Sequence, residues 1–188
     1  MVYLIILGTL AFFAACSNQD QEGIPAQAEP TASTPASMTT AYGDSDLIKK
    51  YLGQINPYIQ EVGKIQLEID KVVGTSQKAT GVNLAKAMKK FKPRLETAQT
   101  EFTKIQPPPL LGKFHSDIKN LIALRLDAYD TTIRASSIEE KTGDEKVYEE
   151  AEQKLGRANE LISVLNGEMA KINQALKTAS TATQTASP

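Results

Sequence analysis

The feature that most constrains this chain is a helical spacing of apolar residues that continues through most of its length. Between positions 44 and 179 the large apolar side chains recur at intervals of three, four and seven, which places them on one face of an α-helix. No run in this region combines a period of two with the β-branched enrichment that is typical of strands. The sequence therefore predicts an all-α fold over residues 44–179.

Four separate stripes of apolar residues indicate four helices. They contain, in chain order, Ile48, Tyr51, Ile55, Tyr58, Val62, Ile65, Ile69 and Val72; Leu84, Met88, Phe91, Leu95, Ala98, Phe102 and Ile105; Leu111, Phe114, Ile118, Leu121, Ile122, Leu126, Tyr129 and Ile133; and Tyr148, Ala151, Leu155, Ala158, Ile162, Leu165, Met169, Ile172 and Leu176. About three apolar positions per heptad make a face broad enough for a globular bundle. Because the connections are short, we expect a monomeric up-down-up-down four-helix bundle.

Proline and capping residues predict where these helices bend and end. Pro57 removes a backbone donor inside the first stripe, so we expect a kink there. The register of the second stripe continues across Pro93, which favours one bent helix, with two short helices as the alternative. The run Gln-Pro-Pro-Pro at 106–109 ends the second helix, and Pro109 can occupy the first position of the third. Thr142, followed three residues later by Glu145, fits a capping box at the start of the fourth.

The first fifteen residues have the composition of a targeting signal. Residues 1–15 are uncharged and mostly apolar, and they are too few to span a bilayer as a helix. They lead directly to Cys16, the only cysteine of the chain. The alternative is a core helix with an ordinary buried thiol, but residues 17–43 contain nothing that could pack against such a helix.

The run Phe13-Ala14-Ala15-Cys16 resembles the lipobox of bacterial lipoproteins. The resemblance implies that the thiol of Cys16 is diacylated and that the lipoprotein signal peptidase removes residues 1–15. By the same resemblance, Ser17 in place of an aspartate implies sorting to the outer membrane, facing the periplasm. Two or three acyl chains would hold the protein on the membrane permanently.

Polar segments flank the expected bundle on both sides. Residues 17–43 are rich in Ala, Ser, Thr, Gln and Pro and contain acidic but no basic residues, a composition that predicts a disordered tether. Residues 180–188 contain no large apolar side chain and predict a disordered tail. The expected organisation is therefore a signal peptide (1–15), a lipidated cysteine with a tether (16–43), a helical bundle (44–179) and a tail (180–188).

The composition excludes most catalytic and cofactor sites. With one histidine and one cysteine, the chain cannot build a di-iron carboxylate site, a c-type haem motif or a zinc ribbon. A b-type haem would need His115 with Met88 or Met169, but methionine on a helical stripe is more often part of the core. The sequence also contains no nucleophile elbow, phosphate loop or dinucleotide fingerprint. We expect no enzymatic activity, cofactor or metal, and the balance of 21 basic against 22 acidic residues argues against a nucleic-acid partner.

Two polar residues in the third helix need a specific explanation. His115 could be a pH-sensitive or ligand-contacting group near a bundle end, but we expect a partly buried imidazole bonded to a backbone carbonyl. Arg125 interrupts an otherwise apolar helix. It could pair with an acid across the bundle or extend past the apolar stripe to solvent.

A run of cations in the second helix is the candidate contact surface. It consists of Lys86, Lys89, Lys90, Lys92 and Arg94, with no acidic residue among them. Their offset from the apolar stripe predicts that this cluster faces solvent, where it could bind anionic lipid, phosphate or acidic cell-wall polymers weakly. The alternative is an ordinary solvated helix face, partly neutralised by Glu149, Glu150 and Glu152 of another helix.

Taken together, these features predict a lipid-anchored protein of the bacterial envelope with a non-enzymatic interaction or structural module. Its layout resembles small secreted bacterial helical lipoproteins, and its expected partner is an envelope protein or an anionic surface. The alternative is a small-molecule sensor or carrier, for which Ala87, Ala98, Ala151 and Ala158 could leave a cavity between helices. An enclosed apolar pocket with convergent polar groups would favour the carrier.

Overall fold

A computed structural model describes residues 38–74, 81–139 and 145–184 of the 188-residue chain. These residues form two strands of two residues each, β1 (Thr39–Thr40) and β2 (Gly43–Asp44), and four α-helices. The helices are α1 (Ser45–Gly74), α2 (Gly81–Phe102), α3 (Gly112–Glu139) and α4 (Glu145–Gln184), with a one-turn 3₁₀-helix, η1 (Pro109–Leu111), before α3. The predicted all-α fold with four helices is confirmed.

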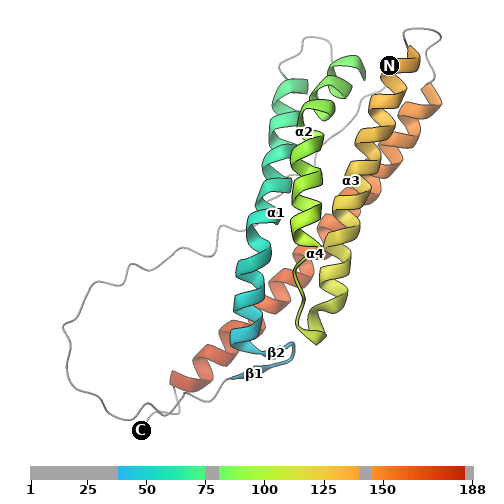
Figure 1. The fold of residues 1–188 in the computed structure, drawn as a ribbon. Helices are drawn as coiled ribbons and strands as arrows, with labels where there is room; N and C mark the ends of the chain where they lie inside the picture. Colours follow the sequence, from blue (N-terminus) through green and yellow to red (C-terminus); the bar gives the residue numbers. More distant parts are fainter. Residues whose placement is uncertain (1–37, 75–80, 140–144, 185–188) are drawn as a thin grey trace.

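Consecutive helices pack against one another and run in opposite directions. Figure 1 shows the chain rising through α1, descending through α2, rising through α3 and descending through α4, which crosses behind the other helices. The main helix contacts join α1 to α2, α2 to α3 and α3 to α4. The far end of α4, the longest helix at 40 residues, reaches the strand β1.

The apolar stripes of the four helices meet in one core. Ile55, Leu95 and Phe102 are completely buried, and Leu111 and Leu165 are 1% exposed. The four alanines that could have left a cavity are themselves buried, where their small side chains let neighbouring backbones approach: Ala87, Ala98, Ala151 and Ala158. For Val72, the last residue of the first predicted stripe, the prediction of burial was wrong, since this side chain is 38% exposed.

Neither internal proline divides its helix. Pro57 lies inside α1 and Pro93 inside α2, and both are exposed on the solvent side. A ring on the solvent side leaves the packed face of the helix intact, so α2 is one helix rather than two. Pro109 begins η1, after Pro108 with an extended backbone (φ −55°, ψ 147°), so the next helical segment starts at Pro109, as predicted, with a 3₁₀ turn before α3. The second helix ends earlier than predicted, at Phe102, before Ile105 and the proline run.

The folded region extends beyond residues 44–179 at both ends. Residues 38–44 form a turn in which Thr40 pairs with Gly43, and the Ser45 N–H donates to the Met38 carbonyl over 2.8 Å. Gly43 has φ +104°, which costs glycine little. Asp44 Oδ1 then accepts from two free N–H groups of the first turn of α1, as a helix cap does. Residues 38–43, expected in the tether, therefore belong to the folded unit, and α4 continues to Gln184 into the expected tail.

Several expectations concern segments outside the described residues. The signal peptide, Cys16, the tether as far as position 37 and the capping residue Thr142 all lie there, and so do residues 185–188 of the tail.

Truncation of a core leucine should destabilise the protein far more than truncation of an exposed one. Leu95 is completely buried, so we expect Leu95→Ala to lower the free energy of unfolding by about 2–5 kcal/mol through lost burial and a cavity. Leu67 is 51% exposed, and Leu67→Ala should change it by no more than about 0.5 kcal/mol. Urea unfolding followed by circular dichroism measures the free energy of unfolding of both variants. Equal losses of stability would contradict the burial of Leu95 in the core.

Candidate functional site

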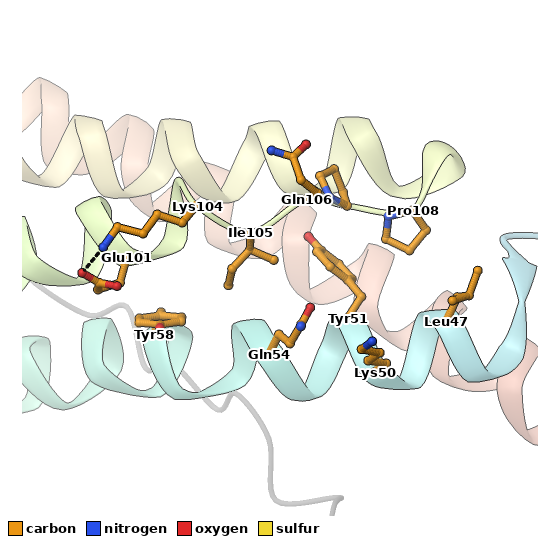
Figure 2. Close-up of a pocket in the computed structure, with 11 residues that line it drawn as sticks. Leu47, Lys50, Tyr51, Gln54, Tyr58, Glu101, Lys104, Ile105, Gln106 and Pro108 are labelled. Carbon is orange, nitrogen blue, oxygen red and sulfur yellow. Dashed lines mark hydrogen bonds and ion pairs between the residues drawn. The ribbon is translucent and has the colours of Figure 1, made fainter.

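A surface groove of about 500 Å³ lies between the first half of α1 and the segment that connects α2 to α3. One wall comes from residues of α1 that are three or four positions apart, and the other from the end of α2 and the proline-rich connection (Figure 2). The lining residues are Leu47, Lys50, Tyr51, Gln54, Tyr58, Glu101, Lys104, Ile105, Gln106, Pro107 and Pro108. The groove therefore combines aromatic and apolar walls with two amides and two cations.

One of the two groove cations already has a partner. Lys104 Nζ lies 2.6 Å from Glu101 Oε1, as Figure 2 shows. Lys50 is exposed and makes no ion pair with any residue that the structure describes. The groove thus presents one unneutralised positive charge.

A buried aromatic group supports the floor of the groove. The Tyr51 hydroxyl and His115 Nδ1 are hydrogen-bonded over 3.1 Å, and the imidazole stacks on Phe102 with ring centroids 4.5 Å apart. Tyr58 packs edge-on against the same Phe102 ring, at 6.5 Å. Burial raises the pKa of Tyr51 and lowers that of His115, with a smaller contribution from Lys119 to the latter, so both groups remain neutral near pH 7. We expected a backbone carbonyl as the partner of His115, and this was wrong: the partner is Tyr51.

Arg125 lies in the core and does not reach solvent. Its side chain is 1% exposed, which excludes the expected alternative in which it extends past the apolar stripe. Its Nη1 donates to Gln66 Oε1 of α1, and Gln66 Nε2 in turn donates to Asp70 Oδ1 over 2.8 Å. Arg125 is therefore connected to the acid Asp70 of α1 through the side-chain amide of Gln66.

The cation cluster of α2 separates into a paired and an exposed part. Lys92 Nζ lies 2.5 Å from Asp130 Oδ1 of α3, and Arg94 contacts Glu61 and Glu68 of α1 at 2.7 and 3.0 Å. The hydrogen bond to Asp130 raises the pKa of Lys92, and those to Glu61 and Glu68 raise the pKa of Arg94. These two cations bind neighbouring helices and are not available to a partner as free charges.

The neutralising acids differ from those expected on another helix. Glu150 was expected to face the cluster, but it pairs with Lys154 and Arg134. The acids on other helices that meet the cluster come from α1 and α3, because α2 packs between these helices, and Lys92 also pairs with Glu96 of α2 itself.

Three lysines of the cluster remain open to solvent. Lys86, Lys89 and Lys90 are exposed and make no ion pair with any of the described residues. The ammonium of Lys90 lies 5.0 Å from the centroid of the Phe91 ring, a cation–π contact that leaves its charge unneutralised. These three side chains, here called the lysine face, lie in the first half of α2, whereas the groove lies at its last turn and beyond.

Neither a metal centre nor a spanning helix occurs in the part of the chain that the structure describes. Across residues 38–74, 81–139 and 145–184, no three His, Cys, Asp or Glu side chains are grouped so that they could hold a metal ion. None of the helices in the same ranges combines the length and apolarity needed to cross a membrane.

Comparisons with family models, curated proteins and solved structures found no match to this chain. The residues that the structure describes define an all-α fold with four helices.

Acidification should weaken the protein through His115. Because burial lowers the folded-state pKa of His115 below about 6.5, the unfolded chain binds more protons between these two values. The free energy of unfolding should therefore fall as the pH drops below about 6.5.

The control variant for this prediction is His115→Gln, which keeps a hydrogen-bonding group near Tyr51 but does not titrate. Urea unfolding between pH 7.5 and 5 should show a steeper loss in the wild type than in this variant. Parallel pH profiles would show that His115 contributes nothing to the loss.

Proposed function

We propose that this chain is a lipid-anchored protein of the bacterial envelope whose helices act as a non-enzymatic interaction module. The observation that carries the proposal is the apolar run that ends in Ala14-Ala15-Cys16, directly before a long polar segment. A short apolar N-terminus, a lone cysteine and a low-complexity tract are the sequence elements of a bacterial lipoprotein. In this proposal Cys16 carries the lipid, and the protein faces the periplasm from the outer membrane.

The proposed module is an up-down-up-down four-helix bundle that acts as a monomer. The alternating directions of the helices and the contacts between consecutive pairs support this topology. A well-packed core supports an interaction role over an internal carrier role, since the alanines of the stripes are buried between helices. A partner that binds the outer surface of the helices needs a rigid core beneath that surface and no internal cavity.

The lysine face is the proposed contact with an anionic partner, such as lipid headgroups or acidic cell-wall polymer. Near an anionic membrane each lysine contributes about 1 kcal/mol, and this falls off over a Debye length of about 10 Å. With a lipid anchor fixing attachment, the role of Lys86, Lys89 and Lys90 is to orient the helices or to select a partner.

A small-molecule sensor or carrier is the second candidate, and the groove favours it. Tyr51, Tyr58 and Pro107 supply apolar surface, and Lys50 and Gln54 supply polar groups directed at the same space. A ligand there would be an amphipathic organic anion, bound at the surface rather than enclosed between the helices.

Lipidation should depend on Cys16. The wild-type protein is expected in the membrane fraction with a mass that lacks residues 1–15 and includes acyl chains. Cys16→Ser should be released from the membrane and lack the acyl mass, because a serine hydroxyl does not replace the thiol. Membrane fractionation and intact mass spectrometry measure both properties. A wild-type protein without acyl mass would disprove the proposal.

Removal of the lysine face should abolish salt-sensitive binding to anionic surfaces. The variant Lys86→Gln, Lys89→Gln, Lys90→Gln is expected to lose most of its binding to anionic vesicles and peptidoglycan at low salt. Cosedimentation at low and moderate salt provides the measurement.

The matched control for this variant changes three exposed lysines of α4 instead, Lys146→Gln, Lys171→Gln and Lys177→Gln. It alters the net charge equally and should bind as the wild type does. Equal losses in both variants would mean that only net charge matters and that the lysine face is an ordinary solvated surface.

A further inference from the structure

The guanidinium of Arg125 is buried in the core with most of its hydrogen-bonding capacity unused. Its side chain is 1% exposed, and only Nη1 has a partner, the amide oxygen of Gln66. Nε and Nη2 are buried, and neither makes a hydrogen bond with any described group. Buried polar groups in folded proteins are nearly always paired, so two unpaired donors on one charged side chain require a specific explanation.

The two unpaired donors lie on the same edge of the guanidinium. Nε–H and the adjacent N–H of Nη2 point in parallel, and this is the edge with which arginine binds two oxygens of a carboxylate or a single spherical anion. Gln66 occupies only Nη1, on the other side. The edge best suited to an anion is therefore the one that no described residue satisfies.

A third buried donor lies near the guanidinium. Tyr129 follows Arg125 by one helical turn on α3, is 1% exposed, and has a hydroxyl that makes no hydrogen bond of normal geometry with any described residue. Against the larger effects of burial, the charge of Arg125 and a looser hydrogen-bonding contact between the two side chains lower the pKa of Tyr129, and the same contact raises that of Arg125. Burial raises the pKa of Tyr129, so the hydroxyl keeps its proton and can donate it.

The nearest acid compensates the charge of Arg125 only at a distance. Asp70 influences the pKa of Arg125, but Gln66 is hydrogen-bonded to both and lies between them. Asp70 is also half-buried, and burial raises its pKa, against the smaller lowering effects of the Gln66 hydrogen bond and the charge of Arg125. A buried cation without a direct counter-charge is costly, and an anion in contact with the guanidinium removes that cost.

We propose that Arg125 and Tyr129 form a buried binding site for one small monovalent anion, either chloride or a carboxylate of the size of formate. Arg125 Nε and Nη2 and the Tyr129 hydroxyl donate to it, while Gln66 holds the guanidinium in place from the other side. The bound anion completes the charge balance of the core beside the Arg125–Gln66 contact between α3 and α1.

The test is the anion dependence of thermal unfolding, measured on the full chain in one fixed non-ionic detergent. Sodium chloride, bromide and formate are compared with sodium gluconate, whose anion is too large for the site, at constant ionic strength and pH 7.5. The melting temperature should rise by about 3–6 °C once a fitting anion reaches about ten times its Kd. The chloride and formate titrations determine which of the two anions binds more tightly.

Arg125→Met should abolish the anion response without unfolding the protein, because apolar groups often replace buried charges without loss of stability. Arg94→Met is the matched control, since it removes the same charge from a surface ion pair, and its anion response should equal that of the wild type. Tyr129→Phe removes one donor and should raise the Kd for the anion about 5-fold. If Arg125→Met does not fold, Tyr129→Phe alone decides the question.

Crystals soaked in bromide give an independent result, because an anomalous peak beside Nε and Nη2 of Arg125 would locate the ion directly. Three outcomes would overturn the proposal: equal melting temperatures in chloride, formate and gluconate, an anion response that Arg125→Met retains, or an unchanged Kd in Tyr129→Phe. Density for an ordered water at this position in crystals soaked in bromide and in crystals soaked in formate would also overturn it.

Discussion

The packing of α2 between α1 and α3 is the constraint on which the rest of the structure depends. Phe91, Leu95 and Phe102 of α2 are all buried, and the helix contacts a neighbour on each side. A helix of 22 residues gains little from its intrinsic propensity, so its stability comes from burial of this face. The solvent side can then tolerate Pro93, which would interrupt a helix at a packed position.

Charged side chains at the boundary of the core reinforce the same arrangement. Arg94 reaches α1 and Lys92 reaches α3, so two neighbouring positions of α2 contact the helices on either side. Exposed ion pairs contribute little stability, typically about 0–1 kcal/mol each. Their greater effect is on the specificity of helix packing, because a rotation of α2 about its axis would break both ion pairs. The same geometry leaves Lys86, Lys89 and Lys90 as the open part of the cluster.

Two polar groups inside the core show how a helical stripe accommodates hydrogen-bonding atoms. Around His115, the Tyr51 hydroxyl and the Phe102 ring satisfy both the polar and the apolar parts of the imidazole. Around Arg125 the described residues supply one acceptor, from Gln66, and leave the opposite edge of the guanidinium unpaired. The first arrangement pairs a ring nitrogen with a hydroxyl of a neighbouring helix, whereas the second leaves Nε and Nη2 without such a partner.

The sequence by itself determined the number of helices, their buried faces and the change of direction at Pro109. These are local properties, because apolar periodicity and proline geometry depend only on nearby residues. The short turn at residues 38–44 was missed, since strands of two residues carry no periodic pattern.

Only the tertiary structure decided which polar groups meet. Tyr51 and His115 are 64 positions apart, and Arg125 and Gln66 are 59 apart. Such pairings depend on the relative height and rotation of packed helices. The spacing of residues within one helix does not contain this information. The sequence therefore marked His115 and Arg125 as unusual, and the packing of α1 against its neighbours determined their partners.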